Sequence, residues 1–346
     1  MLIEKPFTDA EGICRPELEA IMEFPHWKCF IAIAALALGT PAAPALGQAY
    51  PSKPVRILVG VTAGTGPDLE MRQFAPQLAA ELGQQVIVEN RPGNSGVIAA
   101  QAVVKSAPDG YTLLSVQPVL AANPQLYERA GVDIDRDLAP VSLLGIHPWV
   151  LYVHPSVPAN TLAEFVALAK SQPDRFAFGT RGVGSGNHLT GELFQALSRT
   201  RMKHVPFGTG NPANDLLGGH IDAMFYPLIG MVEHVRAGKL RALAISTGNG
   251  RSAQLPDVPT FAEAGLPQFD AYAWFGLVAP AGLPAPVMEK LSAASARAAQ
   301  SAPFREFLGK IGATAVGSTP AEFAAYLKSE RVRWKKVIAE ANLKLD

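Results

Sequence analysis

The stretch Val55-Arg56-Ile57-Leu58-Val59, followed by Ala63-Gly64-Thr65-Gly66-Pro67-Asp68, decides the fold of this chain. The first part is rich in β-branched residues and predicts a strand. The second part breaks that pattern with glycines, and Pro67 followed by Asp68 marks the start of a helix. A strand, a glycine-rich turn and a helix in this order predict an open α/β sheet.

The same alternation continues downstream of this unit. Residues 85–89 and 111–115 are predicted strands, and a helix is predicted between them at about 97–106. Strands that alternate with helices at this spacing predict a parallel, doubly wound sheet.

A second α/β unit is predicted to begin at residue 154. Thr161 and Glu164 form a capping box that starts a helix. Residues 176–179 then lead into a second glycine-rich loop at 182–188. The chain therefore contains two units of the same class, each with a glycine-rich loop after a strand.

The rest of the chain completes the second unit and returns to the first. Thr260 and Glu263 form another capping box, which predicts a short helix. Further strands are predicted at 221–225, 241–245 and 274–279. We therefore expect domain 1 to span 50–153 and 275–346, and domain 2 to span 154–274.

A C-terminal helix is predicted after residue 319. Thr319 and Glu322 form a capping box, with Pro320 at the first helical position. Apolar residues follow at helical spacing, namely Phe323, Leu327, Trp334 and Ile338. We interpret this stripe as core packing.

The first 49 residues are predicted to be a signal peptide region. Lys28 precedes an apolar run at 29–38, which is too short to span a bilayer. Gly47-Gln48-Ala49 fits signal-peptidase cleavage after Ala49. Residues 1–21 are acidic and lack signal character, so Met22 is a candidate for the true start. We therefore expect an exported, periplasmic protein.

Composition excludes several classes of protein. The chain has 346 residues, of which 48% are hydrophobic and 17% charged, so it can bury a large core and is not disordered. A formal net charge of zero, without a basic cluster, argues against nucleic-acid binding. Both cysteines, Cys14 and Cys29, precede the predicted cleavage site, so the mature chain has no disulfide, which suits an oxidising compartment.

The turn after the first strand is the first candidate site. In open α/β sheets, ligands bind beyond the carboxyl ends of strands, where free N–H groups at a helix start favour an anion. A plain tight turn remains the alternative. A dinucleotide site is disfavoured, because Leu69 stands where the Gly64-Thr65-Gly66 fingerprint needs a third Gly or Ala. We expect no cofactor.

The second loop is another candidate nest of backbone donors for an anion. It is not a nucleophile elbow, because Val183 rather than Gly stands two positions before Ser185. The histidines of the mature chain have no partner at metal-ligand spacing, although His188 lies at the loop. We therefore expect no metal site, no catalytic residues and no enzymatic activity.

The chain resembles the Bug family of extracytoplasmic solute receptors, the binding components of tripartite tricarboxylate transporters. The matching stretches are spread in family order over the whole mature chain. They are 50–59 (YPSKPVRILV), 86–93 (VIVENRPG), 107–114 (APDGYTLL), 184–189 (GSGNHL), 215–225 (DLLGGHIDAMF), 237–244 (AGKLRALA) and 255–267 (LPDVPTFAEAGLP).

This resemblance implies a periplasmic-binding-protein-like fold of two α/β domains that close over a small organic carboxylate. It also implies integral-membrane transporter subunits as partners, and we expect a monomer. A ligand-sensing co-receptor and an exported hydrolase remain alternative functions. Carried onto this sequence, the ligand-binding residues are Thr62, Ala63, Gly64, Thr65, Gly66, Asp68, Thr180, Arg181, Ser185, Gly186, Asn187, His188, Tyr226 and Phe275.

Three positions depart from the family pattern. Tyr226 stands where Asp is common, Arg181 where proline is common, and Phe207-Gly208 where an aromatic-basic pair is usual. Loss of the Asp removes a charge that favours an amino group, and Arg suits bidentate carboxylate pairing. Tyr226 and Phe275 offer a flat wall to a ring. We therefore predict a ligand with two carboxylates, or with a carboxylate on an aromatic ring.

Overall fold

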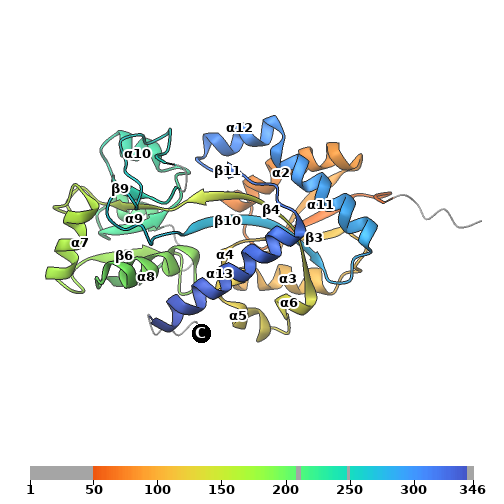
Figure 1. The fold of residues 1–346 in the computed structure, drawn as a ribbon, viewed down its shortest axis with the longest axis horizontal. Helices are drawn as coiled ribbons and strands as arrows, with labels where there is room; N and C mark the ends of the chain where they lie inside the picture. Colours follow the sequence, from red (N-terminus) through yellow and green to blue (C-terminus); the bar gives the residue numbers. More distant parts are fainter. Residues whose placement is uncertain (1–49, 208–211, 248–249, 341–346) are drawn as a thin grey trace, which may run out of the picture. The chain divides into compact units, whose positions relative to one another are not determined.

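The computed structural model describes residues 50–207, 212–247 and 250–340 (Figure 1). The predicted signal region, with Met22 and the cleavage site after Ala49, lies outside the described residues, as does Gly208. The described strands form two separate sheets.

The first sheet has the strand order β11-β4-β10-β3-β1-β2. Its strands are β1 (Val55–Val59), β2 (Val86–Asn90), β3 (Thr112–Val116), β4 (Leu138–Pro148), β10 (Tyr272–Pro280) and β11 (Thr314–Ala315). β1 pairs in parallel with β2 and β3, which confirms the alternation predicted there. β10 runs antiparallel to both β3 and β4. The sheet is therefore mixed rather than purely parallel, because β10 brings the chain back from the second sheet in the opposite direction.

The second sheet has the order β7-β6-β8-β5-β9. Its strands are β5 (Val150–Val153), β6 (Ala177–Thr180), β7 (Lys203–Pro206), β8 (Ala223–Tyr226) and β9 (Arg241–Ile245). Because β4 ends at Pro148 and β5 begins at Val150, the chain passes between the sheets at Trp149. The fold is thus two α/β domains joined by crossing segments, as expected, while the predicted residue boundaries of the domains stay a prediction.

Helices cover both sheets (Figure 1). They are α2 (Gly66–Leu82), η1 (Asn94–Gly96), α3 (Val97–Val104), α4 (Pro118–Ala122), α5 (Pro124–Glu128), α6 (Ile134–Asp137), α7 (Leu162–Ser171), α8 (Gly186–Ser198), α9 (Pro212–Leu217), α10 (Val232–Arg236), α11 (Ala285–Gln300), α12 (Ala302–Lys310) and α13 (Pro320–Glu340). None of those described is long and apolar enough to cross a membrane.

Two of the three predicted capping boxes start helices. Thr161 accepts a hydrogen bond from the Glu164 N–H at the start of α7, and Thr319 and Glu322 bond reciprocally at the start of α13. Thr260 and Glu263 also bond reciprocally, but residues 261–265 form only a turn. The predicted helix there is wrong, because Gly265 has a φ of +93° and ends the turn before a helix can propagate.

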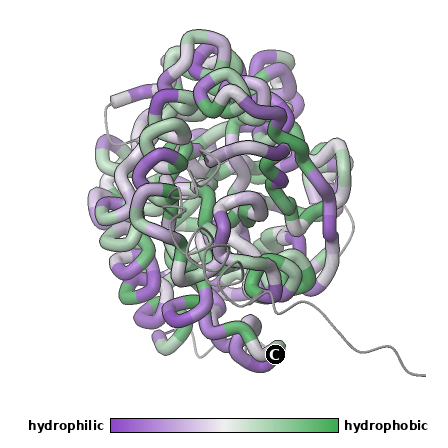
Figure 2. Tube along the Cα trace, turned by 90° about the vertical axis from the view of Figure 1, so that its right-hand side faces the viewer, coloured by the Kyte–Doolittle hydropathy of each residue, from purple (hydrophilic) through white to green (hydrophobic). Residues whose placement is uncertain are grey.

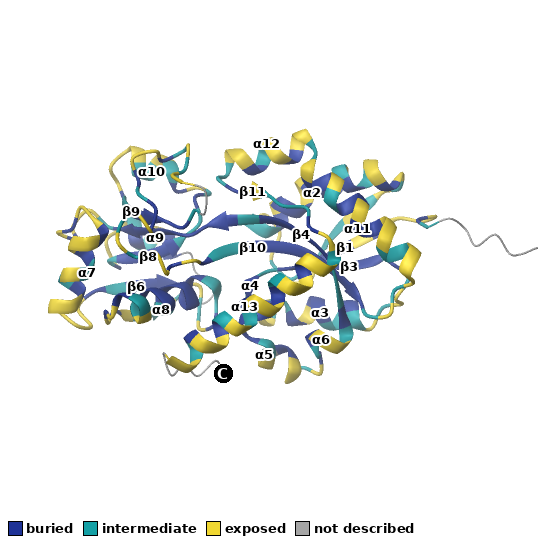
Figure 3. Cartoon of the chain, viewed as in Figure 1, coloured by how far each residue is buried: buried dark blue, intermediate teal, exposed yellow. Residues whose placement is uncertain are grey.

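The hydrophobic core follows the strands. Figure 3 shows the strands largely buried and the outer turns of the surrounding helices exposed, and Figure 2 shows the matching alternation of hydrophobic and hydrophilic residues along the helices. The predicted stripe of α13 is core packing, as expected. Phe323 and Leu327 pack in a cluster with Trp274 of the first sheet, whereas Trp334 packs in the main cluster of the second sheet.

Candidate functional site

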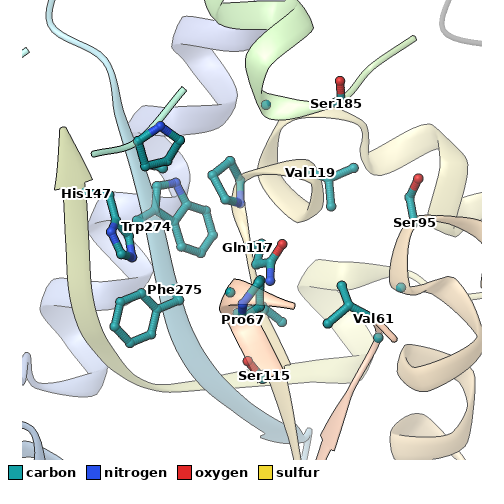
Figure 4. Close-up of a pocket in the computed structure, with 18 of the residues that line it drawn as sticks. Val61, Pro67, Ser95, Ser115, Gln117, Val119, His147, Ser185, Trp274 and Phe275 are labelled. Carbon is teal, nitrogen blue, oxygen red and sulfur yellow. The ribbon is translucent and has the colours of Figure 1, made fainter. Parts of the chain in front are cut away.

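A cavity of about 280 Å³ is lined by residues of both domains (Figure 4). Four parts of its wall are strand ends or helix starts, where unpaired backbone groups lie: the start of α2, the end of β3 with the start of α4, the end of β8, and the start of α8. The link between β4 and β5 and the start of β10 also contribute to the wall. The cavity suits a small organic molecule.

Half of the fourteen predicted ligand-binding residues lie in the cavity wall. They are Gly66, Arg181, Ser185, Gly186, Asn187, Tyr226 and Phe275. The other seven are not in the wall, namely Thr62, Ala63, Gly64, Thr65, Asp68, Thr180 and His188. Contact with a ligand stays a prediction for all fourteen.

The first glycine-rich loop already holds an anion from the protein itself. The buried Asp68 carboxylate accepts hydrogen bonds from Gly64 N (2.8 Å), Arg72 Nε (2.9 Å) and Asn90 Nδ2 (2.7 Å). Burial alone would raise the pKa of Asp68, but these donors lower it, because they stabilise the charged form. The Gly64 N–H therefore holds the loop in shape, and Gly66 and Pro67 are the residues of the loop that line the cavity.

The second loop presents the start of α8 to the cavity. Ser185 is the N-cap residue, but its hydroxyl lies 2.6 Å from Gly182 O and 2.7 Å from Asn187 Oδ1 and makes no capping bond. The first N–H groups of this 13-residue helix are thus left without a side-chain cap. An uncapped helix start in a cavity wall is a favourable place for an anion.

Two buried side chains add donors at the same place. Asn187 is 3% exposed, and its Nδ2 has no hydrogen-bond partner among the described residues, since Ser185 contacts its Oδ1 instead. Trp149 Nε1 is also buried and without a partner there. A Cβ on Gly186 would lie 3.2 Å from Trp149 Cζ2, so glycine allows this indole to approach the helix start closely. Both atoms can only donate hydrogen bonds.

His188 supports the loop from behind the wall. Its Nδ1 accepts a hydrogen bond from Gly184 N (3.0 Å), and its ring stacks on that of His204 with 3.9 Å between centroids. Burial, with a smaller contribution from His204, lowers the pKa of His188 to about 3. The neutral ring therefore acts as an acceptor that shapes the loop. No group of three or more His, Cys, Asp or Glu within the described ranges is arranged to hold a metal ion.

Sequence reasoning missed several residues of the wall, among them Ser115, Gln117, His147 and Trp149. Gln117 had a usable signal, because Pro118 follows it at the start of a helix directly after a predicted strand. His147 and Trp149 had none, since their direction depends on how the chain turns from one sheet into the other.

Comparisons with known proteins agree with this architecture. Residues 70–343 match the family described as tripartite tricarboxylate transporter family receptor. The chain is 37% identical over 319 residues to Protein BugT of Bordetella pertussis, covering 91% of this chain and 96% of that protein.

Two solved structures are similar over most of their length. One is described as R. palustris Rpa4515 with adipate, with 32% identity, a TM-score of 0.75 and coverage of 85% of this chain and 98% of that one. The other is MatC (Rpa3494) from Rhodopseudomonas palustris with bound malate, with 33% identity, a TM-score of 0.72 and coverage of 84% and 100%.

Proposed function

This chain belongs to the family of tripartite tricarboxylate transporter receptors, and from that premise we propose that it captures a small organic carboxylate in the cavity between its two domains. The observation that carries the proposal is the pair of buried, unpartnered donors, Trp149 Nε1 and Asn187 Nδ2, at the uncapped start of α8. Buried donors without a partner in the protein call for one outside it. A carboxylate, which only accepts hydrogen bonds, satisfies both.

The ligands of the two similar structures support the chemical class. Adipate and malate are both small dicarboxylates, and each is named with a protein that is at least 32% identical to this chain. Arg181 also lines the cavity, and no ion pair joins it to another residue in the part of the chain that the structure describes. The guanidinium is thus available for a second carboxylate.

We place the protein in the periplasm as a monomer that delivers its ligand to integral-membrane transporter subunits. Export is supported by the apolar run at 29–38 and the small residues before Tyr50. Delivery to transporter subunits is supported by membership of the receptor family.

A thermal-shift screen of the purified mature protein against mono-, di- and tricarboxylates and aromatic acids tests the function. A true ligand raises the melting temperature as its concentration increases and is recovered chemically unchanged. The variant Asn187→Asp keeps the side-chain shape but places a negative charge against the ligand carboxylate, and it should abolish the shift. Asn214→Asp, on the exposed face of α9, is the matched control. Turnover of the acid, or an undiminished shift in Asn187→Asp, would contradict the proposal.

A further inference from the structure

A buried acid–histidine pair lies in the wall of the same cavity, and carboxylate capture at α8 does not use it. His147, on β4, lies with its Nε2 3.0 Å from Oε1 of Glu70, on α2. Both side chains are more than nine-tenths buried, and both residues line the cavity. Burial of a carboxylate removes it from water and costs free energy. A buried carboxylate in the wall of a cavity that is proposed to bind anions therefore calls for an explanation.

The second ring nitrogen of His147 has no partner. Its Nδ1 is buried and makes no hydrogen bond to any described residue, and the same holds for Oγ of Ser115. Both residues border β10 through the strand register, in which His147 pairs with Ala273 and Ser115 with Leu277. Between these positions lies Phe275, whose ring centroid is 5.5 Å from that of His147 (Figure 4). Two unpartnered polar atoms therefore belong to the domain 1 side of the cavity.

The Glu70 carboxylate determines which ring nitrogen of His147 carries a proton. A carboxylate only accepts, so Nε2 of His147 carries the proton that lies between them. When the ring carries this proton alone, Nδ1 has a lone pair and accepts a hydrogen bond. An acceptor beside a buried carboxylate repels a second carboxylate and favours a group that donates a proton.

The geometry points to a specificity determinant: we propose that His147, held in one tautomer by Glu70, accepts a hydrogen bond from a hydroxyl group on the ligand, so that the protein selects hydroxylated carboxylates over their deoxy analogues. This inference rests on the proposed function and adds to it the second recognised group. His147 is the contact residue, and Glu70 is a positioning residue.

Calorimetric titration with matched pairs of acids tests the inference. The pairs are malate with succinate, 3-hydroxybutyrate with butyrate, and 4-hydroxybenzoate with benzoate. In at least one pair the wild-type protein should bind the hydroxylated acid about tenfold more tightly or better, because a site built for a hydroxyl leaves its polar groups unpaired with the analogue. His147→Phe, which keeps an aromatic ring against Phe275, should remove that preference by weakening the hydroxylated acid alone.

A second variant separates specificity from folding. Glu70→Gln lets the side chain donate as well as accept, which allows the other tautomer of His147, and it should reduce the preference more than it reduces affinity for the deoxy acid. Because it keeps the His147 ring in place, this variant also keeps the test decisive if His147→Phe does not fold. His220→Phe, on the surface, is the matched control.

The titrations distinguish a failure of the hydroxyl contact from a failure of carboxylate capture. Equal affinity for both members of every pair, or equal losses for both members in His147→Phe, overturns the hydroxyl contact while leaving carboxylate capture intact. A failure of all six acids to bind the wild-type protein would count against the proposed function as well.

Discussion

Trp274 and Trp334 donate their indole N–H groups to the same oxygen, Oε2 of Glu330, each at 3.0 Å. Trp274 lines the ligand cavity, whereas Trp334 packs in the core of the second sheet. Glu330 itself is fully buried, and its other oxygen pairs with Arg333 at 2.6 Å. One carboxylate of α13 thus joins the cavity wall to the core of the other domain.

Removal of this carboxylate should destabilise the protein strongly. Glu330→Ala leaves two buried indole donors unpaired and removes one of the two carboxylates that Arg333 contacts, which should lower the free energy of unfolding by roughly 3–5 kcal/mol. Glu330→Gln keeps an acceptor for the indoles and should cost less. Urea denaturation followed by tryptophan fluorescence measures both, with Glu289→Ala on the exposed face of α11 as the control. A loss no larger in Glu330→Ala than in the control would mean that the shared carboxylate does not contribute.

Gly66 lies in the first loop and lines the cavity, so it tests whether α2 approaches the ligand. A Cβ at this position would meet only Oε1 of Glu70, at 3.9 Å, so the fold has room for a side chain. Gly66→Val should therefore change stability by only about 0.5 kcal/mol while it fills part of the binding space and abolishes binding. Gly309→Val on α12, which is equally open, is the control. Unchanged calorimetric affinity in a folded Gly66→Val protein would exclude this contact.

The mature protein should begin at Tyr50. Signal peptidase requires a small residue directly before the cut, which Ala49 supplies. The intact mass of protein extracted from the periplasm should therefore lack the first 49 residues. Ala49→Leu should block the cut and leave the longer form. A periplasmic protein that retains those residues would contradict the assignment.

The sequence predicted the elements whose signals are local. β1, the start of α2 and the stripe of α13 follow from residue type, capping and spacing within one segment. The direction of β10 was not predictable, because it depends on pairing with β3 and β4, which lie more than a hundred residues earlier.

The same contrast applies to the site. The resemblance places Asp68 among the ligand-binding residues, whereas Arg72 stands one helical turn later, at a spacing that favours an ion pair within the protein. That signal was present in the sequence. The pairing of Glu70 with His147 was not, since the two residues are far apart in the chain and meet only through packing of α2 on the first sheet.

Stability should fall in mild acid because of His188. Burial lowers its pKa to about 3 from an ordinary value of 6.5, so the unfolded chain binds this proton at a higher pH than the folded protein does. The contribution is therefore present above pH 6.5 and is lost as the pH falls towards 3. At pH 4 the loss should be on the order of 3 kcal/mol, from the free energy of one pKa unit.

A variant without the titrating ring isolates this effect. His188→Asn retains an acceptor for the Gly184 N–H and should flatten the fall in melting temperature between neutral and acid pH. His220→Asn, an exposed histidine, should keep the wild-type pH profile. The assignment fails if His188→Asn and wild type lose stability in parallel as the pH is lowered.

Arg181 tests whether the cavity recognises a second carboxylate. Arg181 lines the cavity beside the start of α8, where the first carboxylate is proposed to bind. Arg181→Ala should weaken binding of a dicarboxylate by about 1–3 kcal/mol, the range for losing a hydrogen bond to a charged group. A monocarboxylate of the same length should bind nearly as before, because it lacks the group that Arg181 contacts.

Calorimetric titration of both acids measures the difference, with Arg305→Ala on the exposed face of α12 as the control for loss of one positive charge. Equal small losses for both acids would show that Arg181 acts only through its overall charge. A zwitterionic amino acid as the tightest ligand would also contradict the prediction, because the cavity would then select an ammonium group where we expect a second carboxylate.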